Sequence, residues 1–152
     1  MNQTVTGVVA VAIEFKVSPP GPPLTYLGVA DGLMPGIRIL GDASPVPALS
    51  LTLLCAHALE CILKAYLSRS GDDSCVLEPR VRHNLNTLWS MARDAGLDLP
   101  ADPPQWVSLL GNLHGHPYYL RYSNGINCLV LPPQAQMVAG LSELLSMVRN
   151  KL

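Results

Sequence analysis

Charged and aromatic side chains are scarce in this sequence. Of its 152 residues 14% are charged and 5% are aromatic, whereas 49% are hydrophobic, and the formal net charge is −1. A chain with no overall basic field does not attract nucleic acid at long range, so any such binding must rest on a local patch. So little charge also leaves little polar surface for a monomer, which indicates that some apolar surface is buried against a second copy.

Signals for secretion, membrane insertion and metal binding are also missing. Residues 1–13 hold no Lys or Arg, so a signal peptide would lack its charged start, and we find no membrane-spanning run. The four cysteines show no Cys-x-x-Cys spacing, which favours reduced thiols in the cytoplasm. His57 and Cys61 are spaced like two metal ligands, but two ligands do not make a site. We therefore expect a cytoplasmic protein with no metal and no cofactor.

Hydrophobic periodicity predicts a mainly α-helical single domain over residues 1–152, with a small β element. Residues 4–17 alternate between apolar and polar side chains, which predicts a strand, and the proline-rich loop up to residue 23 ends it. Residues 24–152 are predicted to form a helical bundle with a hairpin near 118–131, because Asn124-Gly125 is a strong turn signal. The hairpin and the N-terminal strand would make a two- or three-stranded sheet.

The helices of the bundle follow from apolar spacing and from residues typical of helix ends. A central helix is expected from about Pro47 to Arg69, with Gly71 as a left-handed stop. The other helices are expected over 24–34, where Pro35 and Gly36 interrupt, from Asn84 to before Gly96, from an Asp102–Gln105 capping box to Gly115, and after Pro132-Pro133.

The predicted central helix is apolar almost all round, which is typical of a helix in the middle of a bundle. At about 100° per residue, its polar side chains fall on one narrow stripe, formed by His57, Glu60, Cys61 and Lys64. Glu60 and Lys64 are four residues apart and can form an ordinary surface ion pair. Alternatively, the stripe lines a cleft or a dimer interface, where Glu60 accepts a hydrogen bond from His83 or Arg121, because a buried charge needs a partner.

Two further segments combine basic groups with features suited to phosphates or bases. Arg80, Arg82 and His83 precede a predicted helix start, whose free N–H groups suit a phosphate, although a solvated loop in which His83 packs before the helix is the simpler explanation. The stretch HGHPYYLRY interleaves aromatic and cationic groups, as base stacking with phosphate contact requires, although the tyrosines can simply pack in the bundle. No catalytic residue is assigned, and the candidate binding cleft consists of Glu60, Lys64, Arg80, Arg82, His83, His114, His116, Tyr119, Arg121 and Tyr122.

Four segments, taken in order, resemble the HEPN domain family over about residues 25–150. They are ALECILKAYLSRSG, RHNLNTLWSMARDAGLDL, the W-x-x-LL-x-x-L pattern that starts at Trp106, and LRY. The resemblance implies a compact helical bundle that usually dimerises, as found in prokaryotic toxins and defence proteins. Many members are metal-independent ribonucleases with an Arg and a His four to six residues apart. Here His83 follows Arg80 and Arg82 too closely, so these nuclease residues are not carried over.

Three functions are compatible with these observations. The favoured prediction is a non-catalytic module of a toxin–antitoxin or phage-defence system that binds nucleic acid or a nucleotide. The first alternative is a metal-independent ribonuclease with a displaced pair, such as His83 or His116 with Arg121. The second alternative is a dimeric scaffold that binds a partner protein and no nucleic acid. The expected partners are a second copy of the chain, RNA or a nucleotide, and a cognate protein.

Overall fold

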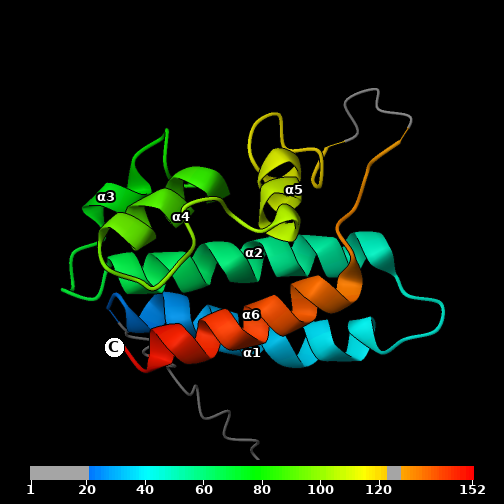
Figure 1. Cartoon of the computed structure of the whole chain (residues 1–152), viewed down its shortest axis with the longest axis horizontal. Coiled ribbons are helices and arrows are strands. Elements are labelled where there is room, and N and C mark those ends of the chain that lie inside the picture. The colour runs from blue at the N-terminus through cyan, green and yellow to red at the C-terminus, as the bar shows by residue number, and fades with distance from the viewer. Residues whose placement is uncertain (1–20, 123–127) are drawn as a thin grey trace, which may run out of the picture.

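The computed structural model describes residues 21–122 and 128–152, which form six helices and no strand. The helix α2 contacts every other long helix: α1 and α6 lie along one side of it, and α4 and α5 cover the other side (Figure 1). The prediction of a mainly α-helical bundle around one central helix is therefore confirmed. The helices are α1 (Leu24–Gly41), α2 (Ala48–Leu67), α3 (Ser74–Leu77), α4 (Leu85–Asp94), α5 (Gln105–His114) and α6 (Gln134–Arg149).

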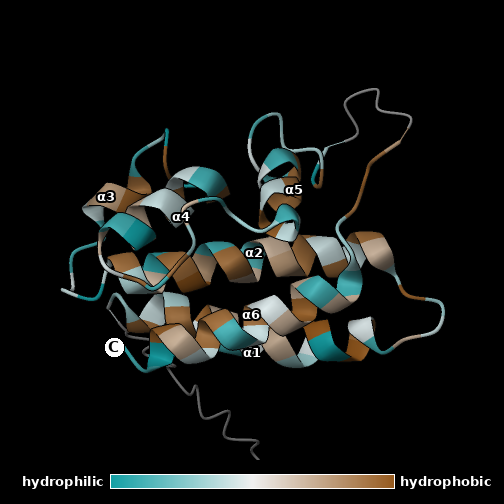
Figure 2. Ribbon diagram, viewed as in Figure 1, coloured by the Kyte–Doolittle hydropathy of each residue, from teal (hydrophilic) through white to brown (hydrophobic). Residues whose placement is uncertain are grey.

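The apolar side chains of α2 supply the middle of the core. Leu51, Leu59, Ile62 and Leu63 are fully buried, and the ribbon of α2 is mostly coloured as hydrophobic (Figure 2). Among the described residues, α2 is the one helix long and apolar enough to cross a membrane, and 67% of that apolar stretch is buried within the bundle. A mostly buried core helix passes the same test of length and hydropathy. Packing in the middle of the bundle therefore explains why the side chains of α2 are so apolar.

Some helix ends follow the predicted chemistry, and one does not. The side chain of Asn84 caps α4 by accepting a hydrogen bond from the backbone N–H of Thr87 at 3.0 Å. Gly71 has a φ of +92°, as expected for the left-handed residue after the central helix. The capping box predicted for α5 is wrong, because the helix begins at Gln105 with no side-chain cap. The residue before a proline is disfavoured in helical conformation, so the helix starts after Pro104 and not at Pro103.

The predicted interruption at Pro35 is also wrong, because α1 continues through this proline to Gly41. A proline in a helix interior removes one backbone hydrogen bond, at a cost of about 3 kcal/mol. On either side of it, Met34 and Ile37 are buried against the bundle, whereas Pro35 itself is exposed. Packing of the buried side chains on α1 against α2 therefore outweighs the local defect.

The β element is not found in the part of the chain that the structure describes. The strand predicted for residues 4–17 and the turn at Asn124-Gly125 lie outside the described residues. The first arm of the predicted hairpin is wrong, because the backbone N–H groups of Arg121 and Tyr122 donate to the carbonyl of Tyr118 at 2.9 and 3.0 Å. These are tight turns, and Leu120 is buried beside the end of α5, where its N–H donates to the carbonyl of Leu113. Burial of one leucine thus folds the segment back onto α5.

Candidate functional site

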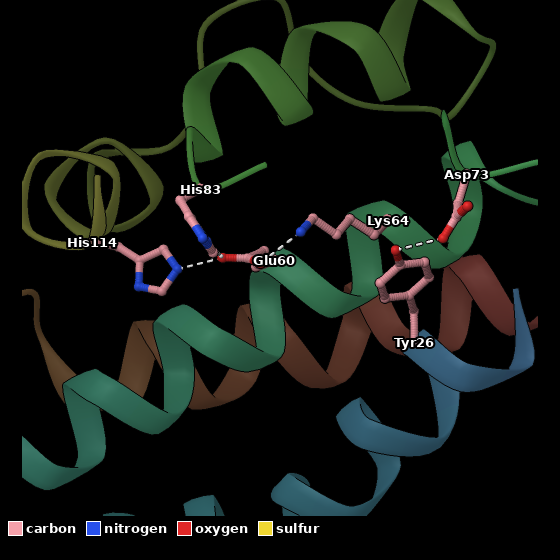
Figure 3. Close-up of polar contacts among 6 residues, drawn as sticks. All are labelled: Tyr26, Glu60, Lys64, Asp73, His83 and His114. Atoms are coloured by element: carbon pink, nitrogen blue, oxygen red, sulfur yellow. Dashed lines mark hydrogen bonds and ion pairs between the residues drawn. The ribbon is translucent and has the colours of Figure 1, made fainter. Parts of the chain in front are cut away.

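The carboxylate of Glu60, on α2, is the centre of a buried polar cluster (Figure 3). One oxygen, Oε1, accepts a hydrogen bond from Nζ of Lys64 at 2.7 Å. The other oxygen, Oε2, lies 3.1 Å from Nδ1 of His83 and 2.5 Å from Nε2 of His114. A carboxylate only accepts hydrogen bonds, so both ring nitrogens donate. We call these four residues the Glu60 cluster.

Three different elements bring the Glu60 cluster together. Glu60 and Lys64 are one turn apart on α2, His83 lies in the turn before α4, and His114 is the last residue of α5. Both residues of the ion pair are almost completely buried, with 4% and 5% of their surface exposed. The prediction that Glu60 accepts a hydrogen bond from a neighbouring element is confirmed for His83. Arg121, the other predicted partner, is exposed and is not among the described contacts of Glu60. The second histidine that contacts Glu60 is His114.

The environment of Glu60 keeps its carboxylate ionised. Burial alone would raise its pKa, but hydrogen bonds from His114, Lys64 and His83 and the charge on Lys64 lower the pKa from 4.5 to about 2. A buried carboxylate with three donors and one adjacent cation is a satisfied ion pair and not an isolated charge. The polar stripe of α2 therefore holds a buried ion pair at a fixed position inside the bundle.

Two histidines near the Glu60 carboxylate, His114 and His57, differ in how deeply they are buried. The ring of His114 is buried, and its Nδ1 has no hydrogen-bond partner among the described residues. His57, one turn before Glu60 on α2, is half-buried, and burial lowers its pKa below 6.5. Its imidazole is therefore neutral at pH 7 and does not add charge to the Glu60 cluster.

The polar contacts continue beyond Lys64 toward the start of α1. The Tyr26 hydroxyl donates to Oδ2 of Asp73 at 2.9 Å, and Nζ of Lys64 lies 5.8 Å from the centre of the Tyr26 ring (Figure 3). Burial and this contact with Asp73 raise the pKa of Tyr26 to about 12. Tyr26 therefore stays protonated and closes this side of the cluster with an aromatic face.

A cleft of about 720 Å³ opens above the Glu60 cluster, between the turn before α4 and the C-terminal end of α5. This volume suits a small-molecule ligand. His83 belongs to both features, because it contacts Glu60 through Nδ1 and lines the cleft. Nε2 is thus the ring nitrogen of His83 that remains for a ligand. The polar side chains that line the cleft are Arg80, His83, Asn84, Asn86, Asn112, His116, Tyr118 and Tyr119.

Tyr118 holds the aromatic wall of the cleft together. Its ring packs edge-on against His83, His116 and Tyr122, with ring centres 6.0, 5.7 and 6.3 Å apart. The guanidinium of Arg121 lies 6.0 Å from the same ring. Tyr118 has a φ of +65°, a conformation that is strained for a side chain of this size and that clusters at functional sites.

The structure thus brings most of the predicted site residues into two connected groups. Glu60, Lys64, His83 and His114 form the buried cluster, whereas Arg80, His116 and Tyr119 line the cleft. Arg121 and Tyr122 are exposed, and each contacts the ring of Tyr118, which lines the cleft. Arg82 is exposed and does not line the cleft.

Sequence reasoning missed four polar residues of the cleft: Tyr118, Asn84, Asn86 and Asn112. Tyr118 belongs to the recognised aromatic stretch, but alternation along a presumed strand concealed its role. The pattern predicts Asn84 only as a helix cap, and no sequence signal marks Asn86 or Asn112, which lie on separate helices.

No protein-family model, curated protein or solved structure matches this chain.

Proposed function

We propose that this chain is a HEPN-like, non-catalytic module that binds single-stranded RNA or a nucleotide in the cleft. The observation that carries the proposal is the chemistry of the cleft lining, which combines one guanidinium, several amides and an aromatic wall around about 720 Å³. Because the net charge is −1, binding has to depend on such a local arrangement.

Each group in the lining suits a different part of a nucleotide. Arg80 is exposed and has no ion-pair partner in the described part of the chain, so its guanidinium is available for a phosphate. Tyr118 and Tyr119 offer aromatic surface to a base, which contributes about 1–3 kcal/mol per stacked base. The side-chain amides of Asn86 and Asn112 can donate to and accept from base edges.

A titration of labelled single-stranded RNA and of nucleotides, followed by anisotropy at several salt concentrations, tests this proposal. Affinity should fall as salt rises, because phosphate contacts release counterions. Arg80→Ala should weaken binding and reduce the salt slope by about one, and Tyr118→Ala should weaken binding with the slope unchanged. The matched control is Arg38→Ala, which removes an exposed arginine from α1, on the other side of α2. No binding at low salt, or equal losses for Arg38→Ala and Arg80→Ala, would refute the proposal.

A second candidate function is a metal-independent ribonuclease, favoured by the contact between Glu60 and His83. The carboxylate orients the imidazole through Nδ1, which leaves Nε2 to accept a proton from a ribose hydroxyl in the cleft. Incubation with RNA in EDTA separates this function from simple binding. Cleavage that disappears in His83→Ala and persists in His57→Ala would favour the nuclease, whereas binding without cleavage would exclude it.

We also infer a homodimer, a cytoplasmic location and a cognate protein partner. Dimerisation is supported by large apolar side chains that are exposed among the described residues, including Ile39 at 71%, Val130 at 70% and Leu24 at 58%. A cytoplasmic location is supported by four free cysteines. The toxin–antitoxin or phage-defence setting and the cognate partner rest on the family resemblance alone. Sedimentation equilibrium tests the dimer, and a monomer at every concentration would exclude it.

A further inference from the structure

Two imidazole nitrogens in the Glu60 cluster converge on a single carboxylate oxygen. Nδ1 of His83 and Nε2 of His114 both lie beside Oε2 of Glu60, and the three ligand atoms are within 4.8 Å of one another. Two histidines and one carboxylate are a frequent ligand set for divalent transition metals. We propose that Glu60, His83 and His114 bind a divalent transition-metal ion, with zinc as the preferred ion. This proposal does not depend on RNA binding.

The distances require only a small rearrangement. In a tetrahedral zinc site the ligand atoms lie about 2.0–2.1 Å from the ion and therefore about 3.3 Å from one another. The contact between His83 and Glu60, at 3.1 Å, is already close to this value, and that between His114 and Glu60, at 2.5 Å, has to open by less than 1 Å. The two ring nitrogens, now within 4.8 Å of each other, also have to come to about 3.3 Å. Each ring then carries its proton on the other nitrogen, Nε2 of His83 and Nδ1 of His114, so that Nδ1 of His83 and Nε2 of His114 offer their lone pairs to the ion.

The surroundings fix two of the three ligands in position. Lys64 holds Oε1 of Glu60 at 2.7 Å, so the carboxylate has a fixed orientation and offers Oε2 to the ion. Burial of His114 in the core fixes the position of its ring. The positive charge of Lys64 opposes a divalent ion, so we expect weaker binding than at a closed structural site. Lys64→Met should therefore tighten metal binding.

The cleft supplies an entry path and an open coordination position. His83 lines the cleft while its side chain is 29% exposed, so an ion bound to Nδ1 lies just below the cleft floor. The part of the chain that the structure describes brings no fourth His, Cys, Asp or Glu into this group. The ion would therefore have three protein ligands and one open position for water or an anionic oxygen. Metal sites that bind a substrate have this arrangement.

Cobalt(II), whose visible absorption reports its ligands, and zinc test the proposal in titrations of metal-free protein. The wild type should bind one ion per chain, with the visible bands of a site containing nitrogen ligands. His83→Ala should weaken binding at least tenfold, and circular dichroism should show that this variant is folded. His114→Ala should have the same effect, but its buried position makes His83→Ala the decisive variant.

A matched histidine variant identifies the site. His57→Ala removes a half-buried histidine from α2 that lies outside the three proposed ligands, so it should bind the ion as the wild type does. The proposal is overturned if the wild type binds no ion, or if His57→Ala weakens binding as much as His83→Ala. These outcomes are independent of RNA, so failure of the metal site leaves the proposed function standing.

Discussion

Replacing Glu60 by Gln should destabilise the fold strongly, because it removes the only negative charge described next to the buried ammonium of Lys64. Two estimates of the magnitude agree. The lowering of the Glu60 pKa from 4.5 to about 2 corresponds to about 3 kcal/mol of stability at pH 7. Removing one partner of a buried ion pair costs about 3–5 kcal/mol in general. We therefore expect Glu60→Gln to lower the free energy of unfolding by about 3 kcal/mol.

The pH dependence of this loss has a definite sign. The pKa of Glu60 is lower in the folded protein than in the unfolded chain, so the stabilisation is fully present above pH 4.5 and is lost as the pH falls toward 2. The difference in stability between the wild type and Glu60→Gln should therefore be largest at pH 7 and much smaller near pH 2. Urea denaturation followed by circular dichroism at the two pH values measures it.

A control and a double mutant make the test specific. Glu143→Gln changes an exposed glutamate on α6 and should alter stability by less than about 0.5 kcal/mol. The double variant Glu60→Gln/Lys64→Met should be more stable than the sum of its single changes by about 1–3 kcal/mol, because no charge is left unpaired. A loss below about 1 kcal/mol for Glu60→Gln, or additive single changes, would refute the reasoning.

Three further predictions concern packing, capping and thiol exposure. Gly140→Ala should lower the melting temperature, because its Cβ would lie 2.5 Å from the indole of Trp106, and overpacking costs about 1–3 kcal/mol. Gly32→Ala, in open space on α1, should raise it, and shifts of the same sign would contradict the packing. Asn84→Ala should cost about 1 kcal/mol in urea denaturation, and no loss would mean that α4 does not depend on its cap. Iodoacetamide at pH 8 should label exposed Cys128 before buried Cys55, because burial raises the pKa of Cys55 to about 12. Mass spectrometry measures the two labelling rates, and equal rates would contradict the burial of Cys55.

The helices could be predicted because their signals are local. The spacing of leucines and the cap at Asn84 depend on residues within one helical turn, and both are found in α4 of the structure. The hairpin prediction failed because the alternation of side chains after Tyr118 competes with burial of Leu120 against α5, which no local pattern reveals. The prediction that the helix breaks at Pro35 was wrong for a similar reason, because packing of α1 on α2 is a tertiary effect that no local pattern reveals.

The candidate site could be predicted only in part. The pair of Glu60 and Lys64 has the same spacing whether it lies on a surface or in a core, so its burial follows only from the apolar residues around it. His83 was a candidate partner because it opens the next helix. The contact of His114 with Glu60 spans 54 residues of sequence, and nothing local marks this histidine as different from His116.

The central claim about the buried site is that the Glu60 carboxylate accepts a hydrogen bond from each of two histidines below the cleft. A long-range proton–nitrogen spectrum of the histidine rings in the metal-free wild-type protein at neutral pH tests this claim most directly, because it shows which ring nitrogens carry protons. The account predicts a proton on Nδ1 of His83 and on Nε2 of His114. An unprotonated Nδ1 on His83, or an unprotonated Nε2 on His114, would contradict it.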